Sequence, residues 1–183
     1  MLEARHLSYR YGKSDPWLFR DLSFSLGSGE ILGLTGPSGA GKTTLAKILC
    51  GFLPADKGDV FIDHQPVRLN GFYPVQMVFQ HPELAVNPHW KIAKILKEGF
   101  IPSPHLMRTF NIHQDWLDRY PWELSGGQLA RVCLVRALGP GTRFLVADEI
   151  TAMLDAVTQG RIWNSLLDYS RQNEIGMLII SHD

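Results

Sequence analysis

A glycine-rich stretch in the first third of the chain carries the clearest chemistry of the sequence. It has the spacing of a glycine, four further residues and then Gly41-Lys42-Thr43, with an apolar run at residues 31–35 before it and a helical pattern at residues 45–49 after it. Strand, glycine loop and helix in this order predict a phosphate-binding loop, because the loop turns backbone N–H groups toward phosphate oxygens and the helix start adds partial positive charge. Lys42 is expected to reach the β- and γ-phosphates of a nucleotide, and Thr43 to ligate Mg²⁺. The residues expected around the phosphates are Gly36, Pro37, Ser38, Gly39, Ala40, Gly41, Lys42, Thr43 and Thr44.

An acidic pair follows a second apolar run. Asp148 comes directly after the four apolar residues 144–147, which is the arrangement of the Walker B motif. A carboxylate at this position can hold Mg²⁺, directly or through water, and the next residue, Glu149, could polarise the attacking water. An acidic pair at a strand end is common by itself, but the phosphate loop upstream favours the interpretation as a metal and catalytic site.

Residues 124–128, with the sequence Leu-Ser-Gly-Gly-Gln, form a third motif. Physically this is a capped helix start with two bare glycines, which suits a second anion site, although a plain helix cap would have the same chemistry. The complete five-residue motif, shortly before the acidic pair, resembles the signature of the ATP-binding cassette (ABC) family. The resemblance spans nearly the whole chain, and its motifs are specific in both order and spacing.

This resemblance implies a fold, a ligand and a set of partners. In the family two cassettes form a head-to-tail dimer, and each ATP, with Mg²⁺, lies between the phosphate loop of one cassette and the signature of the other. Tyr11 matches the aromatic residue that stacks on adenine, with Tyr9 as the competing candidate. The other residues that the resemblance assigns to the site are Gln80 (the Q-loop glutamine that senses Mg²⁺), Ser125, Gly126, Gly127 and Gln128 (the signature), Asp155 (the D-loop aspartate) and His182 (the switch histidine).

A closer likeness concerns the branch of the family. Residues 79–82 and 85–88, followed by residues 92–100, resemble the peptide and nickel importers. This implies an ATPase subunit that drives a membrane permease, works indirectly with an extracytoplasmic solute-binding protein, and lies at the cytoplasmic face of the membrane as a peripheral subunit. Two alternatives stay open: a soluble cassette ATPase without a transport role, and a weakly hydrolysing subunit of a heterodimer. The sequence does not name the solute or decide between a homodimer and a heterodimer.

The sequence departs from the family pattern in three places. Ile150 stands where the family usually has proline, and Ala152-Met153 replaces the usual Ser-Ala of the D-loop. The chain stops at Asp183, directly after the switch histidine, where family members continue with further strands and helices. We therefore expect a C-terminally truncated cassette that binds nucleotide but hydrolyses it poorly, because a terminal His182 lacks later structure to hold it.

The elements that must position these residues indicate an α/β fold with a mostly parallel sheet. Four apolar runs, at residues 31–35, 75–79, 144–147 and 177–180, end just before the predicted site residues, and ligands of open parallel sheets lie beyond the carboxyl ends of the strands. We expect one ABC ATPase domain over residues 1–183, with a P-loop NTPase core and an N-terminal antiparallel β subdomain in residues 1–80 and 140–183. Residues 81–139 are expected to form an inserted helical subdomain that includes the signature helix. Its helices are expected at residues 90–100 and 126–138, with one or two more within residues 106–120, and another helix follows at 156–170.

Composition narrows the class of protein. The chain has 183 residues and a formal net charge of zero, which argues against a nucleic-acid partner, since a phosphate footprint normally needs excess basic charge. No apolar run approaches the roughly 20 residues that cross a bilayer, and the N-terminus lacks the core of a signal peptide. Cys50 and Cys133 each lie in an apolar helical pattern and are expected to be buried, reduced thiols. A membrane role would therefore act through a partner protein.

Overall fold

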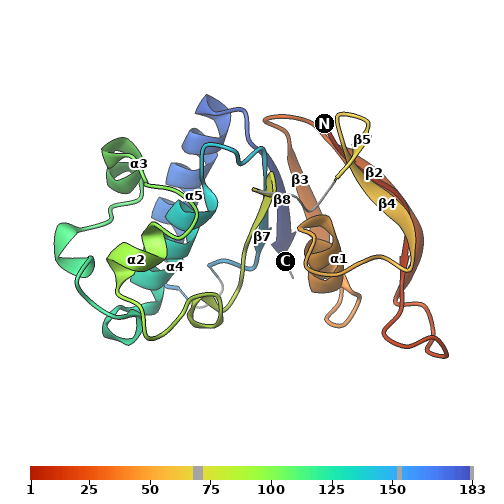
Figure 1. Cartoon of the computed structure of the whole chain (residues 1–183), viewed down its shortest axis with the longest axis horizontal. Coiled ribbons are helices and arrows are strands. Elements are labelled where there is room, and N and C mark those ends of the chain that lie inside the picture. The colour runs from red at the N-terminus through yellow and green to blue at the C-terminus, as the bar shows by residue number, and fades with distance from the viewer. Residues whose placement is uncertain (68–71, 152–153, 182–183) are drawn as a thin grey trace.

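The computed structural model describes residues 1–67, 72–151 and 154–181, and its centre is a parallel sheet (Figure 1). The strand order is β3-β8-β7-β6, and all three neighbouring pairs are parallel. The expected α/β fold is confirmed and all four predicted strands are present, but the prediction that all four are buried is wrong for β3. Their bounds are β3 Ile31–Thr35, β6 Val75–Val78, β7 Phe144–Asp148 and β8 Gly176–Ser181.

The central strand β7 is buried along its whole length. Phe144 and Val146 belong to the apolar cluster on one face of the sheet, and Leu145 and Ala147 belong to the cluster on the other. A strand covered on both faces is apolar at every position, which is why residues 144–147 read as a continuous apolar run. Strand β3 alternates between exposed and half-buried residues and lies at the edge of the sheet.

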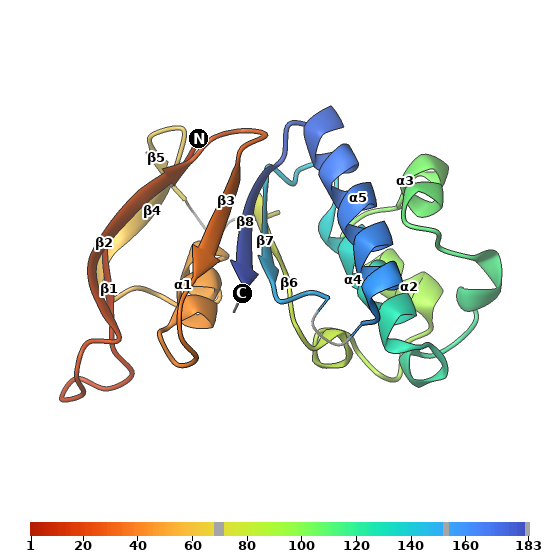
Figure 2. The same ribbon diagram turned by 180° about the vertical axis from the view of Figure 1, so that it is seen from behind.

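A second sheet, antiparallel and also four-stranded, contains the N-terminal segment. Its order is β2-β1-β4-β5, with Leu2 opposite Leu26 in one pair and opposite Ile62 in the other. Its buried side chains pack with those of α1, which lies between the two sheets in both views (Figures 1 and 2). The antiparallel β subdomain predicted at the N-terminus is therefore present. The bounds are β1 Leu2–Tyr9, β2 Phe19–Leu26, α1 Lys42–Leu49, β4 Lys57–Ile62 and β5 Gln65–Pro66.

Helices cover the other face of the parallel sheet (Figure 2). Apolar side chains of α2, α4 and α5 join those of β6, β7 and β8 in one cluster, so the inserted segment packs onto the sheet instead of enclosing a separate core. The helices are α2 Ile92–Leu96, α3 Pro104–Thr109, α4 Gly126–Ala137 and α5 Ala156–Gln172, with 3₁₀ turns η1 Pro82–Leu84, η2 Gln114–Trp116 and η3 Pro121–Glu123.

Two of the predicted helices differ from the structure. The helix expected at residues 90–100 has only the five residues of α2, because Ile92 N donates to Arg119 O (2.9 Å) and Ala93 N donates to Leu117 O (2.9 Å), so a neighbouring segment replaces the preceding turn. The helix expected from residue 106 begins earlier, since Ser103 Oγ accepts from Leu106 N at 3.1 Å and a proline occupies the first helical position. It ends at Thr109, and η2 follows as a separate turn.

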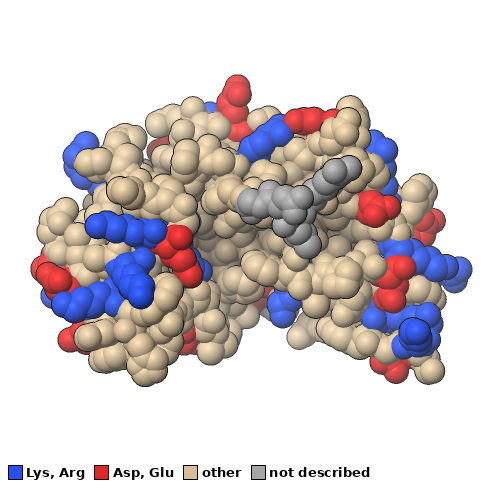
Figure 3. Space-filling model, viewed as in Figure 1, with Lys and Arg blue, Asp and Glu red and all other residues tan. Residues whose placement is uncertain are grey.

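Charged side chains of both signs are interspersed on the face drawn in Figure 3. None of the helices in the described ranges is both long and apolar enough to cross a membrane.

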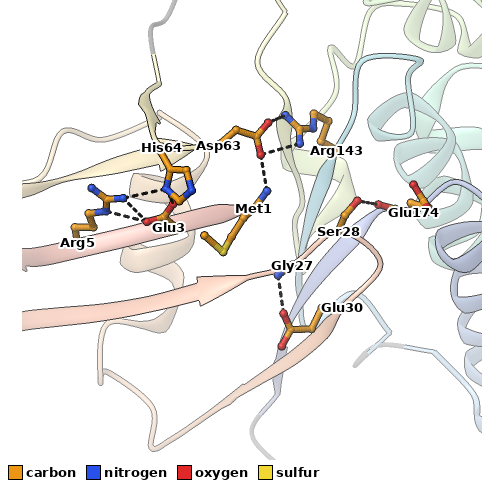
Figure 4. A network of polar contacts seen from close by, with 10 residues as sticks. All are labelled: Met1, Glu3, Arg5, Gly27, Ser28, Glu30, Asp63, His64, Arg143 and Glu174. Carbon is orange, nitrogen blue, oxygen red and sulfur yellow. Dashed lines mark hydrogen bonds and ion pairs between the residues drawn. The ribbon is translucent and has the colours of Figure 1, made fainter.

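A polar network ties the antiparallel sheet to the start of β7 (Figure 4). The carboxylate of Asp63, in the turn between β4 and β5, accepts from Arg143 Nη1 at 2.6 Å and from the Met1 amino group at 2.7 Å. These hydrogen bonds, that of Arg143 first, hold the pKa of Asp63 well below its usual range. The network therefore depends on Asp63 being ionised.

We expect Asp63→Asn to lower stability at neutral pH and to remove part of its pH dependence. A depressed folded-state pKa adds stability above the unfolded value, near 4, and this contribution is lost as pH falls toward the folded value. Asparagine tolerates the left-handed backbone found at this position (φ 49°). Urea unfolding at pH 7 and pH 3 should give a lower midpoint for the variant at pH 7 and a smaller difference between variant and parent at pH 3, because pH 3 lies between the folded and unfolded pKa values of Asp63. Asp59→Asn, an exposed change on β4, is the control; an equal loss at both pH values would contradict the prediction.

Candidate functional site

The predicted phosphate loop connects β3 to α1. Gly39 and Gly41 have positive φ angles of 80° and 89°, and a Cβ added at Gly41 would lie 2.8 Å from Leu18 Cγ, so only glycine fits there. The Lys42 ammonium donates to Gly36 O at 2.7 Å and to Pro37 O at 3.0 Å, which draws it back across the loop. No side chain caps the start of α1. The loop thus gathers a lysine and a helix N-terminus at one point, the combination that binds phosphate.

The two predicted Mg²⁺ ligands from the loop and from β7 are in direct contact. Thr43 Oγ1 donates to Asp148 Oδ2 at 2.8 Å, although the two residues are 105 positions apart in sequence. Asp148 is 5% exposed and ends β7, in the middle of the sheet. A hydroxyl and a carboxylate are the hard oxygen donors that Mg²⁺ prefers, so this pair suits the ion. Gln80, the third predicted ligand, lies two residues beyond the end of β6, the strand beside β7.

Glu149 has a backbone conformation that is rare outside glycine. Its φ angle is 50°, and its N–H donates to Ile180 O of β8 at 3.2 Å. Non-glycine residues in this region carry strain and are concentrated at functional sites. A proline at position 150 would restrict the backbone of the residue before it, so Ile150 leaves Glu149 free of that restriction. The replacement of the usual proline by Ile150 therefore coincides with a strained backbone at Glu149, the predicted general base.

The loop after Glu149 is held by two residues that the sequence did not single out. The Gln159 side-chain amide donates to Thr151 O and to Leu154 O, both at 2.9 Å, and Trp163 Nε1 donates to Thr151 Oγ1 at 3.1 Å. Both lie on α5, where helical periodicity predicts which side of the helix is buried but not which side chains bond to the loop. The predicted D-loop aspartate, Asp155, caps α5, and its hydrogen bonds with Thr158 and then with Val157 lower its pKa. Ala152, Met153 and His182 lie outside the described residues.

The signature motif begins α4 as a complete capping box. Ser125 Oγ accepts from Gln128 N at 3.3 Å, and Gln128 Oε1 accepts from Ser125 N at 2.9 Å. This turn lies at the same end of the molecule as the phosphate loop but across the parallel sheet from it (Figure 2). The chain therefore brings together the phosphate loop, Asp148 and Glu149, and keeps its own signature on the opposite side of the sheet.

The two candidate adenine-stacking residues have different surroundings. Tyr9 is packed against the apolar cluster under the antiparallel sheet and stacks on Phe19 with ring centroids 6.3 Å apart. Tyr11 is 72% exposed, and its hydroxyl lies 2.9 Å from Thr44 Oγ1 at the start of α1. An exposed ring beside the phosphate loop is available to a base, whereas Tyr9 serves the core. The geometry thus favours Tyr11.

Comparisons with known proteins find relatives in sequence and solved structures with the same fold. A family model described as "ABC transporter" matches residues 19–152. The nickel import system ATP-binding protein NikE of Staphylococcus aureus (strain MSSA476) is 32% identical over an alignment that covers all of this chain and 80% of the relative. A solved structure of the ATP-binding cassette MJ0796, dimeric and bound to ADP and Pi, has a TM-score of 0.82 and 21% identity and covers 100% of this chain and 88% of that one. CbiO1 of Clostridium perfringens, part of the transporter complex cbiONQ, has a TM-score of 0.80 and 22% identity and covers 100% and 78%.

Proposed function

This chain belongs to the ABC transporter family and is an ATPase, and on that premise we propose that it is the energy-supplying subunit of an importer for nickel or peptides. ATP binding closes a head-to-tail dimer and hydrolysis opens it. The helical segment, residues 81–139, passes that motion to a membrane permease. The observation that carries the proposal is the contact of Thr43 with Asp148 beside the phosphate loop, since it joins two oxygen donors that suit the Mg²⁺ of a bound nucleotide.

The described residues fit ATP and Mg²⁺ in separate roles. Lys42 and the N–H groups at the start of α1 would bind the β- and γ-phosphates, and Tyr11 would stack on the base. Mg²⁺, held by Thr43, Asp148 and Gln80, would neutralise charge on the phosphate oxygens. Glu149 would hold and orient the attacking water, and His182 would contact the γ-phosphate.

The position of the signature turn supports a second cassette as partner. Ser125, Gly126 and Gly127 lie across the sheet from the chain's own phosphate loop, so they are available to a nucleotide bound by another subunit. A helix start with exposed N–H groups can complete the phosphate contacts there. The dimeric arrangement of the MJ0796 cassettes supports this proposal. Asp155, at the start of α5, would lie near the same interface.

A groove beside the predicted Q-loop supports a permease as partner. It has a volume of about 460 Å³ and lies between α1, β6 and the end of α2, on the hollowed face seen in Figure 3. Aromatic side chains line it: Phe52 and Phe72 are 58% and 45% exposed, and the rings of Phe52 and Phe79 are 5.8 Å apart. Exposed aromatic clusters mark protein interfaces. We propose that a cytoplasmic segment of the permease binds here, one residue from Gln80, which would place the chain at the cytoplasmic face of the membrane.

The NikE relatives favour nickel as the solute over peptides. The solute-binding protein would act only through the permease. The alternative of a soluble ATPase without a transport role lacks support from a basic surface, since the net charge is zero.

The composite site can be tested by mixing two inactive variants. Gly126→Asp adds a negative charge to the signature turn; a side chain has room there, and an acidic residue in the first turn of a helix is tolerated or favourable. We expect Gly126→Asp and Lys42→Ala each to be inactive as ATPases when assayed alone. An equal mixture should recover part of the parent rate, because a mixed dimer has one intact phosphate loop facing one intact signature. Phosphate release is the measurement.

Gly126→Ala, which adds a side chain without a charge, is the matched control and should hydrolyse ATP close to the parent rate. If Gly126→Asp alone is fully active, the signature of this chain does not face a nucleotide. If the two variants fail to complement although both are folded and Gly126→Asp still binds ATP, the chain works with a different cassette subunit.

A further inference from the structure

A cavity that belongs to neither the phosphate loop nor the proposed permease groove lies between α4 and α5. It has a volume of about 400 Å³ and also borders the end of α3 and the segment before η2. Its polar lining consists of Asn111, His113, Arg131, Thr158, Arg161 and Ser165. Two of these residues are arginines and a third is a histidine, while no carboxylate lines the cavity among the described residues. The lining is therefore rich in hydrogen-bond donors and positive charge.

Among the described residues, no carboxylate neutralises the positive charge in this cavity. Arg131 Nε donates to Gly127 O at 3.2 Å and Arg131 Nη1 donates to Asn111 O at 3.3 Å, and its guanidinium lies 4.9 Å from the centre of the Trp116 ring. In the described part of the chain, neither Arg131 nor Arg161 lies within 4.0 Å of a carboxylate oxygen. The pKa of Arg131 is lowered, first by burial and second by the charge of Arg161, which shows that the two guanidinium groups repel each other. An anion between them would relieve that repulsion.

The cavity is connected to the signature turn through two residues. Arg131 holds the carbonyl of Gly127, as described above, and a Cβ added at Gly127 would lie 3.3 Å from Thr158 Cγ2. Thr158 in turn donates its backbone N–H to Asp155 at 3.0 Å. A ligand held by Arg131 and Thr158 would therefore rest against the first turn of α4 and the first turn of α5 at the same time.

We propose that this cavity binds a small oxyanion with at least two negative charges, such as a phosphate or a dicarboxylate, and that the bound anion braces the signature turn. Planar guanidinium groups match paired oxyanion oxygens, and the hydroxyls of Thr158 and Ser165 can supply further donors. A volume of this size suits a small molecule, not a folded segment. The binding step itself does not depend on the proposed function, because it uses none of the predicted nucleotide ligands.

Calorimetry with two probes tests the site and identifies the ligand class. Inorganic phosphate and succinate are titrated separately into the chain in the presence of Mg²⁺ and a non-hydrolysable ATP analogue, which occupies the phosphate loop. We expect one of the two anions to bind, and Arg161→Gln to weaken that binding by about tenfold or more through loss of a charge-assisted contact. Arg161 is exposed and glutamine is a good helix former, so the variant should fold.

Arg171→Gln, an exposed arginine near the end of the same helix, is the matched control and should bind like the parent. Lys42→Ala should also retain the binding, which separates this cavity from the phosphate loop even if the chain fails to bind ATP. Binding of neither anion to the parent, or equal affinities for the parent and Arg161→Gln, would overturn the proposal. If Arg161→Gln leaves both anions bound and weakens self-association instead, a carboxylate of a second copy is the occupant and the small-anion site is wrong.

Discussion

Glu149→Gln is expected to lower the rate of ATP hydrolysis by about a hundredfold or more while leaving ATP binding close to the parent value, since a positioned general base contributes at least about that factor. Glu149 follows the Asp148 ligand directly and is fixed to β8 through its backbone N–H. Glutamine has the same size as glutamate and can adopt the same backbone, so the substitution removes the base without adding strain. Bound nucleotide should then accumulate, and the closed dimer should become visible by size-exclusion chromatography in a chain extended to the length of its curated relatives.

A second glutamate with a similar backbone conformation provides a matched control for this experiment. Glu174 also has a positive φ angle, 53°, but lies two residues beyond the end of α5, just before the start of β8, whereas the phosphate loop follows the end of the neighbouring parallel strand β3. Glu174→Gln repeats the chemical change and the backbone conformation, so any effect of strain alone would appear in both variants. ATPase rates at saturating ATP are the measurement. A parent-like rate in Glu149→Gln would assign the general base to another group.

The strands, and the meeting of the residues at their carboxyl ends, were predictable because a strand buried on both faces has a continuous apolar sequence. Residues 144–147 are apolar without alternation, and the acidic pair stands just beyond them, so a parallel sheet predicts that Asp148 lies near the phosphate loop. The Thr43–Asp148 contact bears this out at 2.8 Å. The capping box at Ser125 was equally readable, because its two side chains bond to their own backbone within four residues.

Contacts between distant segments were not predictable in the same way. Helix α2 begins at Ile92 because carbonyls of residues 117–119 accept its first N–H groups, and no local pattern contains that information. Gln159 and Trp163 both donate hydrogen bonds to Thr151, in the loop between β7 and α5, although by sequence they are ordinary residues of a helix. The resemblance pointed to Tyr11 with Tyr9 as a competitor, and only the exposure of the Tyr11 ring separates the two candidates physically.

Lys42→Ala is expected to weaken ATP binding by about a hundredfold, because two charge-assisted hydrogen bonds to phosphates are each worth about 1.5–3 kcal/mol and each 1.4 kcal/mol is tenfold in affinity. Lys42 is 8% exposed, and its ammonium already lies over the loop, bonded to Gly36 O and Pro37 O. The phosphates would therefore replace two carbonyl acceptors at a cation that is positioned in advance. Alanine leaves no cation within reach of either phosphate from this position.

Fluorescence titration with a labelled ATP analogue measures the affinity, and circular dichroism checks that α1 is retained. Lys47→Ala, on the same helix but one turn farther along, removes an equal charge and should bind ATP like the parent. An unchanged affinity in Lys42→Ala would refute the assignment of the phosphate loop, and with it the composite site. Equal losses in both variants would indicate a general effect of charge on nucleotide binding, because the two lysines differ in their access to the loop and not in their charge.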